Sequence, residues 1–526
     1  MSGISLSPSS IRLINEPSQC EKRAWLKARG IEGLPPSEFQ ELLFVKGKDH
    51  ETKVLDELLK KFPGKTDLGG PDNPACEEQT AAALEARDGS VLYQAGLTVK
   101  TVIAGSEVTV VGYPDFLLPE DGGWVIGDAK LTSSTLNKPR KDGSQTPKGD
   151  KKYIHSQLQL YSWLLREIYG IEASELRIYT GTGTVELVAD DGGQEALETL
   201  AKVLHLQGLA GEPFEAVGWS KCKASACSYR DRCWPKAEEE KALGLIPKLN
   251  VSQVNKLRED GLTSYDQMLS DYDDRSLAEL KTKGGGQDPK QRAWARRHLE
   301  SAAALESGEF VRRCDDEGVP VPLPGEVFQD ANYVMFDLEG DAADAGLPVD
   351  IYLWGMQVFG DSPGEFTCAI APFLEGDKGI EEGWWEFLSL ARVILDEHPG
   401  IRFVHWAEYE RTWVGKYVNE RFGDDDHGTG AEVLAALLDL RPIAERVVAF
   451  PTPSYSLKVI EPYVGFTRTE DEVSKGDESM VAYTAAKLSG DPKIQEATLA
   501  SIAAYNREDL EGTWMVHRWL VENLRA

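Results

Sequence analysis

The sequence predicts an α/β protein with more than one domain. Its 526 residues exceed the roughly 250–300 residues at which a single hydrophobic core stops growing. After residue 325, runs of β-branched and aromatic residues alternate with helical repeats, a pattern typical of an α/β domain. A proline-rich segment at 320–324 marks the boundary before it. We therefore expect three parts: residues 1–240, 241–324 and 325–526.

Composition limits the kinds of partner. Hydrophobic residues make up 41% and charged residues 27% of the chain, as in ordinary globular proteins. The 57 basic and 87 acidic side chains leave a net charge of −30. Such a charge repels polyanions at long range, so an enzyme acting on nucleic acid would need local basic patches. No apolar signal segment or membrane-spanning run is evident, and we expect a cytoplasmic location without a membrane partner.

Two β-rich runs, 113–118 and 124–130, flank a turn at 120–123 and predict a hairpin. With a four-residue loop, Asp115 lies opposite Asp128, with Cβ atoms about 4.5–5.5 Å apart. Two carboxylates so placed repel unless a cation lies between them, which predicts a divalent metal site. Lys130 shares the face of Asp128 and could neutralise a phosphate or activate water. The alternative is a solvent-facing hairpin with scattered charges.

Helices are predicted on both sides of this hairpin. Upstream, His50 lies in the first turns of a helix over 46–59 and could be a neutral imidazole ligand or a surface histidine. Downstream, Gln157 and Tyr161 share one face of a helix that follows a basic loop. The loop is a candidate nucleic-acid contact or a solvated surface feature. Its basic residues are Lys138, Arg140, Lys141, Lys148, Lys151 and Lys152.

Four cysteines have the pattern of a metal cluster. Cys222, Cys227 and Cys233 lie in one short segment, and Cys20 lies far upstream as a possible fourth ligand. A reducing compartment keeps such thiols available for metal. Zinc and an iron–sulfur cluster both accept four thiolates, so the spacing leaves both open.

These motifs together resemble the RecB-like branch of the PD-(D/E)XK nucleases, which has a restriction-endonuclease-like fold, and its iron–sulfur subgroup that includes CRISPR-associated exonucleases. The resemblance rests on the order of His50, Gly112–Asp115, Gly127–Lys130, Gln157 and Tyr161, bracketed by the cysteines. It implies that His50, Asp115 and Asp128 bind Mg²⁺ or Mn²⁺, that Lys130 assists catalysis, and that Gln157 and Tyr161 position the substrate. It also implies that the four cysteines hold a 4Fe-4S cluster, with zinc as the alternative. One departure is the longer spacing between Cys222 and Cys227 than the family usually has.

The middle segment is expected to be helical. Residues 246–265 predict a helix, a glycine turn and a second helix, which looks like a helix-hairpin-helix element. Backbone amides in such an element can hold a phosphate. A plain helical spacer explains the segment equally well.

The C-terminal segment places carboxylates on a strand and on a late helix. Asp337 and Glu339 share one face of a strand over 333–339. Tyr505 and Asp509 share one face of a helix over 502–514. Further strands are expected over 351–359, 365–371 and 401–406, and helices over 381–396 and 409–422. Exposed surface carboxylates are the ordinary explanation for such acids.

Their order is similar to that of the DnaQ-like (DEDD) exonucleases of RNase H fold. Glu410 occupies the middle motif, where aspartate is usual. The resemblance implies that Asp337, Glu339, Glu410 and Asp509 bind two divalent ions and that Tyr505 orients the water.

The whole chain looks like the bacterial family of RecB-like nucleases joined to an RNase H-like domain. The resemblance implies a metal-dependent nuclease, with a 3'–5' exonuclease fold in its C-terminal part, that acts on single-stranded or free-ended DNA in repair or in defence against foreign DNA. Two alternatives stay open. One is a DNA-binding subunit that recruits a helicase partner and has one inactive centre, and the other is an RNA-processing exonuclease.

Overall fold

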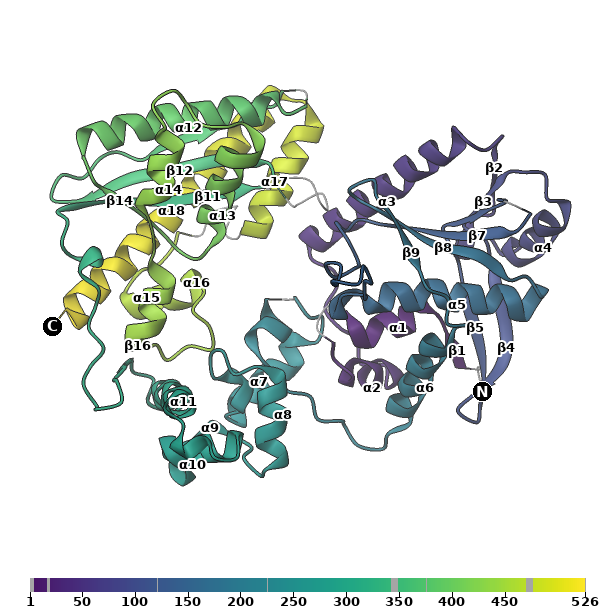
Figure 1. Ribbon diagram of the computed structural model, residues 1–526, viewed down its shortest axis with the longest axis horizontal. Coiled ribbons are helices and arrows are strands. Elements are labelled where there is room, and N and C mark those ends of the chain that lie inside the picture. The colour runs from purple at the N-terminus through teal and green to yellow at the C-terminus, as the bar shows by residue number, and fades with distance from the viewer. Residues whose placement is uncertain are drawn as a thin grey trace. The chain divides into compact units, whose positions relative to one another are not determined.

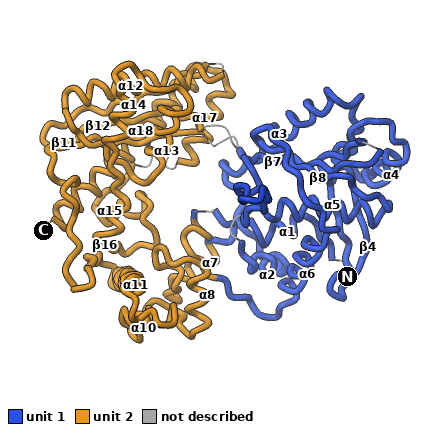
Figure 2. The backbone as a smooth tube through the Cα atoms, viewed as in Figure 1, with its two compact units in different colours: residues 1–215, 224–230, 343–347 blue, residues 216–223, 231–342, 348–526 orange. Residues whose placement is uncertain are grey.

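The computed structural model of the chain describes residues 4–16, 19–120, 122–224, 226–341, 349–374, 376–469 and 476–525. These residues form two compact units (Figure 2). Unit 1 contains the described residues up to 215 and residues 224–230, and unit 2 contains 216–223 and the described residues from 231 onward. The segment expected to be a separate helical connector therefore clusters with unit 2, and the three-part division stays a prediction.

Unit 1 is built on a six-stranded mixed sheet, ordered β2-β3-β6-β7-β8-β9, with a three-stranded sheet ordered β1-β5-β4 (Figure 1). The first sheet contains β2 (Lys65–Asp67), β3 (Val91–Tyr93), β6 (Phe116–Leu118), β7 (Trp124–Lys130), β8 (Ala173–Thr180) and β9 (Val185–Val188). The second contains β1 (Ile4–Leu6), β4 (Leu97–Ile103) and β5 (Ser106–Gly112).

Strands β6 and β7 form the predicted hairpin with the predicted register. Phe116 pairs with Gly127 and Leu118 with Val125, so Asp115 and Asp128 stand at the next position along the ladder. All of β6 and residues 124–128 of β7 are buried. Both faces of the hairpin are therefore buried over this stretch.

Helices α3 and α5 pack against this sheet. Helix α3 (Glu38–Leu59) begins at Ser37, whose side chain accepts the Gln40 N–H, and it packs on β7. Helix α5 (Lys152–Tyr169) packs on β7 and β8, and its buried residues include Leu160 and Leu164. The remaining helices of the unit are α1 (Pro8–Asn15), α2 (Lys22–Ala28), α4 (Cys76–Ala86) and α6 (Gln194–Gly208).

Unit 2 is built on a five-stranded sheet ordered β13-β12-β11-β14-β15. Its central strand β11 is antiparallel to β12 and parallel to β14, which is parallel to β15. Stacked aromatic rings, including Phe336, Trp354 and Phe387, fill the core beneath it. The strands are β11 (Asn332–Gly340), β12 (Ile351–Gly360), β13 (Thr367–Ile370), β14 (Arg402–His405) and β15 (Leu437–Asp439), and a separate pair is β10 (Val311–Arg312) with β16 (Val448–Ala449).

The helices of unit 2 follow the predicted pattern, with one shortening: the helix expected over 409–422 is α13 (Tyr409–Lys416) followed by a π-helical turn over Tyr417–Arg421. The segment expected to form a helix pair is α8 (Val251–Glu259) and α9 (Tyr265–Asp271), joined through Gly261 at φ +92°. Helix α18 (Pro492–Leu524) packs against β11 and β12. The others are α7 (Arg230–Glu239), α10 (Asp274–Lys281), α11 (Pro289–Ser307), α12 (Lys378–Glu397), α14 (Thr429–Ala436), α15 (Leu440–Val447), α16 (Leu457–Ile460) and α17 (Gly476–Ser489).

Within the described segments, every helix is too short or too polar to traverse a bilayer.

Candidate metal centres

The first centre lies where the hairpin of unit 1 brings two aspartates together. Asp115 precedes β6, and its carboxyl group lies within hydrogen-bonding reach of the Asp128 carboxyl group on β7. Asp115 Oδ2 also accepts the backbone N–H of Ala129 at 2.9 Å. Asp128 is fully buried and forms an ion pair with Lys130. The structure thus brings together the carboxylates and the lysine that the sequence singled out.

The electrostatics of this centre suit a divalent cation. Desolvation, and then the charge of Asp128, raise the pKa of Asp115 well above its ordinary value. Desolvation alone would lower the pKa of Lys130, but the charges of Asp128 and Asp115 outweigh it and raise that pKa. The lysine therefore stays charged while the two carboxyl groups cannot ionise together without cost. A bound divalent ion would remove this cost.

Helix α5 supplies two further residues. Gln157 Nε2 donates to Asp128 Oδ1 at 3.4 Å and to Tyr161 Oη at 2.9 Å. Desolvation, and then the charges of Asp128 and Asp115, raise the pKa of Tyr161 well above its ordinary value. Gln157 and Tyr161 are therefore part of the same polar cluster as the aspartates.

His50 lies on α3 with Nε2 3.0 Å from the carbonyl oxygen of Tyr179. Tyr179 is the β8 partner of Ala129, the neighbour of Asp128. A carbonyl oxygen can only accept, so Nε2 carries the proton, and Nδ1 is the nitrogen with the lone pair that a metal needs.

Glu51 is a third carboxylate at this centre, and the sequence analysis missed it. Its Oε1 accepts hydrogen bonds from Tyr93 Oη at 2.6 Å and from Gln94 Nε2 at 2.8 Å, and it pairs with Lys48 at 3.0 Å. Gln94 Nε2 also lies 3.4 Å from Asp115 Oδ1, so one amide joins the two carboxylates. The only feature of the sequence that could have indicated Glu51 is its position directly after His50 on the same helix.

The basic loop is held at its ends and exposed in its middle. Lys148 Nζ donates to the carbonyl oxygen of Ser134 at 2.9 Å, and Lys152 forms an ion pair with Glu195. The residues from Lys138 to Lys141 are exposed.

The four cysteines fall in both units. Cys20 and Cys227 belong to unit 1, and Cys222 and Cys233 belong to unit 2. Cys222 and Cys227 are buried, and the other two are half-buried. The four-thiolate cluster stays a prediction.

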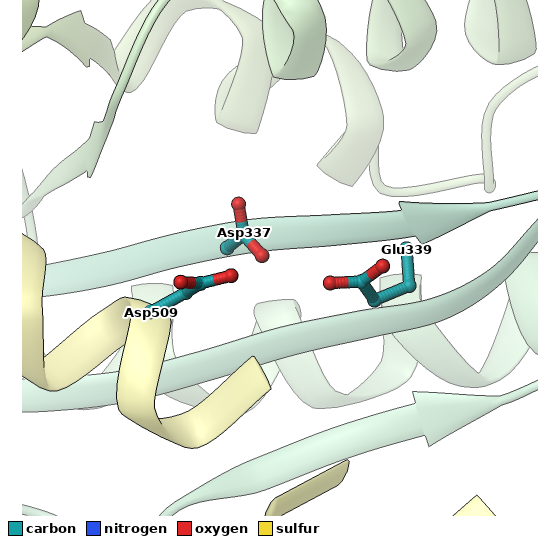
Figure 3. Close-up of side chains that lie close together, drawn as sticks. All are labelled: Asp337, Glu339 and Asp509. Carbon is teal, nitrogen blue, oxygen red and sulfur yellow. The ribbon is translucent and has the colours of Figure 1, made fainter. Parts of the chain in front are cut away.

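The second centre lies on the central strand of unit 2. Asp337 and Glu339 of β11 and Asp509 of α18 each direct a carboxylate oxygen to within 4.8 Å of the others (Figure 3). Strand periodicity places the first two on one face, and α18 packs against that strand. Among the residues that the structure describes, no other set of three or more metal-ligating groups is this compact.

Glu410 of α13 joins this cluster. Its carboxyl group hydrogen-bonds with Asp337, and burial raises the pKa of Glu410 to about 8. His405 Nδ1 lies 3.1 Å from Glu410 Oε2 and 2.6 Å from the carbonyl oxygen of Ala407. Ala407 has φ +87°, and its N–H donates to Asp439 Oδ1 at 3.0 Å. Asp439 thus stabilises the turn at Ala407 that precedes α13 and positions Glu410.

Burial raises the pKa of Asp337 and of Glu339 as well. For Asp337 the next cause is the charge of Asp509, and for Glu339 it is the charge of Asp337. Two cations lie close to these acids. Arg468 forms ion pairs with Asp509 and Glu461, and Lys458 Nζ donates to Tyr505 Oη at 2.7 Å. Five carboxyl groups thus face two cations, and this donor set fits divalent ions.

The hydrogen bond from Lys458 orients the phenol of Tyr505. Desolvation, and then the charge of Asp509, raise its pKa, so the phenol stays protonated. An ammonium group can only donate, so the Tyr505 oxygen accepts from Lys458 and keeps its own O–H proton for another acceptor.

Comparison with known proteins assigns both halves. Residues 40–234 match the model of the PD-(D/E)XK nuclease superfamily, and residues 334–521 match that of the RNase_H superfamily. No curated protein matched the chain. One similar solved structure, titled "Crystal structure of SSO0001", is 12% identical, with a TM-score of 0.23, covering 44% of this chain and 86% of that one. Both superfamilies are phosphodiester-hydrolysing nuclease folds.

Proposed function

Because the chain joins a PD-(D/E)XK nuclease domain to an RNase H-like domain and is a metal-dependent nuclease, we propose that it degrades DNA that is single-stranded or has free ends. Its role would be in repair or in defence against foreign DNA. One observation carries the proposal: each unit has a buried carboxylate cluster with a cationic side chain beside it.

In the first centre, Asp115 and Asp128 would hold Mg²⁺ or Mn²⁺, with His50 contributing through Nδ1. Such an ion supplies charge neutralisation and acidifies water when bound. Lys130, kept charged by Asp128, offers an ammonium group to the scissile phosphate. Gln157 and Tyr161 hold Asp128 and position the substrate strand.

In the second centre, Asp337, Glu339, Glu410 and Asp509 would hold two divalent ions. Tyr505 directs its O–H proton toward the attacking water, and Lys458 fixes the phenol for that task. Arg468 offsets part of the negative charge through Asp509 and Glu461.

Contact with nucleic acid is supported by the basic loop before α5, and the helix pair α8 and α9 is a second candidate phosphate-binding element. The loop residues from Lys138 to Lys141 are exposed, as phosphate-binding lysines and arginines must be. A net charge of −30 opposes broad nucleic-acid binding, so contact would be confined to such local patches.

The test compares the parent with Asp128→Ala and Asp509→Ala on end-labelled single-stranded DNA, duplex DNA and RNA, with Mg²⁺ or Mn²⁺. We expect Asp128→Ala to abolish most DNA cleavage and Asp509→Ala to retain it. Glu522→Ala, at an exposed position of α18, is the control. Binding of DNA without cleavage by the parent would favour a recruiting subunit of a helicase assembly, and preferred cleavage of RNA would favour an RNA-processing enzyme.

The proposal includes a 4Fe-4S cluster held by Cys20, Cys222, Cys227 and Cys233, with zinc as the alternative. Anaerobic purification followed by absorbance and by iron and zinc analysis distinguishes the two. Loss of the bound metal is expected in Cys227→Ser and not in Cys368→Ser.

A further inference from the structure

Asn506 lies between the second centre and the strand beside it. It is fully buried on α18, and its Nδ2 donates to Asp337 Oδ2 at 2.7 Å. Its Oδ1 has no hydrogen-bond partner. A buried side-chain amide with one end satisfied and the other unpaired is uncommon and calls for an explanation.

Gly355 of β12 explains the position of the unpaired oxygen. It is the direct cross-strand partner of Asp337, and a Cβ at this position would lie 1.7 Å from Asn506 Oδ1. The missing side chain therefore opens the space that the amide of Asn506 fills. Any other residue at 355 would push the amide away from Asp337.

The chemistry of the two ends fixes the orientation of the amide. When Asp337 is ionised, as a metal ligand must be, the reverse orientation would place the carbonyl oxygen of Asn506 against its carboxylate at hydrogen-bonding distance, and two acceptors repel. With Nδ2 toward Asp337, the oxygen instead occupies the space that a Cβ at position 355 would fill. Asn506 can thus act only as a donor to Asp337.

We infer that Asn506, seated over Gly355, is a positioning residue that holds Asp337 in the orientation in which it binds metal. Its hydrogen bond occupies Oδ2, the same carboxyl group contacts Glu410, and rotation of Asp337 is restricted from both sides. Outer partners of metal-ligating carboxylates act in this way. This inference rests on the proposal that Asp337 is a metal ligand, and it does not depend on the substrate.

The experiment measures Mn²⁺ binding by the full-length protein with no nucleic acid present. It therefore tests the inference independently of whether the protein cleaves DNA. Asp128→Asn serves as the parent, because it weakens the first centre. We expect Asn506→Ala to weaken Mn²⁺ binding about 10- to 100-fold. Unfolding temperatures measured in EDTA check that each variant folds. Asn523→Ala, at an exposed asparagine on the same helix, is the matched control.

A double-mutant cycle separates positioning from packing. If Gly355→Ala acts by displacing Asn506, it should weaken Mn²⁺ binding about tenfold in the parent and less than about twofold in Asn506→Ala. Equal effects in the two backgrounds, or Mn²⁺ affinity of Asn506→Ala within about twofold of the parent, would overturn the inference. If Gly355→Ala does not fold, the titration of Asn506→Ala decides alone.

Discussion

Glu51 shows how a single residue can extend a metal centre. Its Oε1 takes three polar contacts, from Lys48, Tyr93 and Gln94, and these fix the carboxylate on the side of Asp115. Its charge also contributes to the raised pKa of Asp115. This geometry makes Glu51 a candidate metal ligand of the first centre, in addition to His50 with its unprotonated Nδ1.

Replacing Glu51 by glutamine keeps its shape and removes its charge. We expect Mn²⁺ affinity of the first centre to fall about tenfold, because a carboxylate that ligates or orients a ligand is lost. The measurement is a Mn²⁺ titration in an Asp509→Ala background. Glu57→Gln, an exposed glutamate on the same helix, should leave the affinity unchanged. Unaltered binding by Glu51→Gln would assign this glutamate a purely structural role.

At the level of elements, helix α18 ties the second centre to the core of unit 2. His517, one of its buried residues, packs against the rings of Tyr333 and Trp514. Burial lowers the pKa of His517 to about 4, so it stays neutral in the folded protein over the physiological range. The anchor of this helix is therefore sensitive to acid.

The sign of the pH effect follows from linkage. The unfolded chain takes up a proton at His517 near pH 6.5, whereas the folded chain does so only near pH 4. Stability from this residue is thus present above pH 6.5 and is lost as pH falls toward 4, by up to about 1.4 kcal/mol per pH unit. His517→Phe should flatten the dependence of unfolding free energy on pH in this window. Denaturant unfolding at several pH values measures it, and an unchanged slope would refute the assignment.

The elements that sequence analysis placed best were the local ones. The register of β6 and β7 followed from one turn and two strands, and Asp337 with Glu339 followed from strand periodicity. Asn506 and Asp337 are 169 residues apart, and their contact depends on a glycine in a third element. Glu51 is likewise joined to Asp115 by hydrogen bonds through Gln94, which lies more than forty residues after it in the sequence. Contacts of this kind join residues that are far apart in the sequence and arise from tertiary packing, so short-range periodicity cannot predict them.

Across the whole molecule, the two centres differ in how far their own side chains neutralise them. In the first, three carboxylates face two lysines: Glu51, Asp115 and Asp128 against Lys48 and Lys130. In the second, five carboxyl groups face two cations: Asp337, Glu339, Glu410, Glu461 and Asp509 against Lys458 and Arg468. The second centre therefore depends more on added positive charge.

This difference predicts unequal responses to metal. On adding Mn²⁺ to chelated protein, we expect amide hydrogen exchange to slow more in β11 and α18 than in β6 and β7, because bound ligand stabilises the part that holds it. Hydrogen–deuterium exchange with mass spectrometry reports each segment. Asp509→Ala should remove the added protection of α18 and leave that of β7. Greater protection of β7 in the parent would contradict the charge comparison.

Tyr505, Asn506 and Asp509 all project from one stretch of α18. Their mutual spacing is set by the rise and rotation of an α-helix, at about 1.5 Å and 100° per residue, and needs no loop to adjust it. Once α18 packs against the sheet in the correct register along its axis, the phenol, the amide and the carboxylate are all placed together. A shift of α18 by one helical turn along its axis would displace all three side chains at once. The packing of α18 against β11 and β12 is therefore a single contact whose change would inactivate the centre of unit 2.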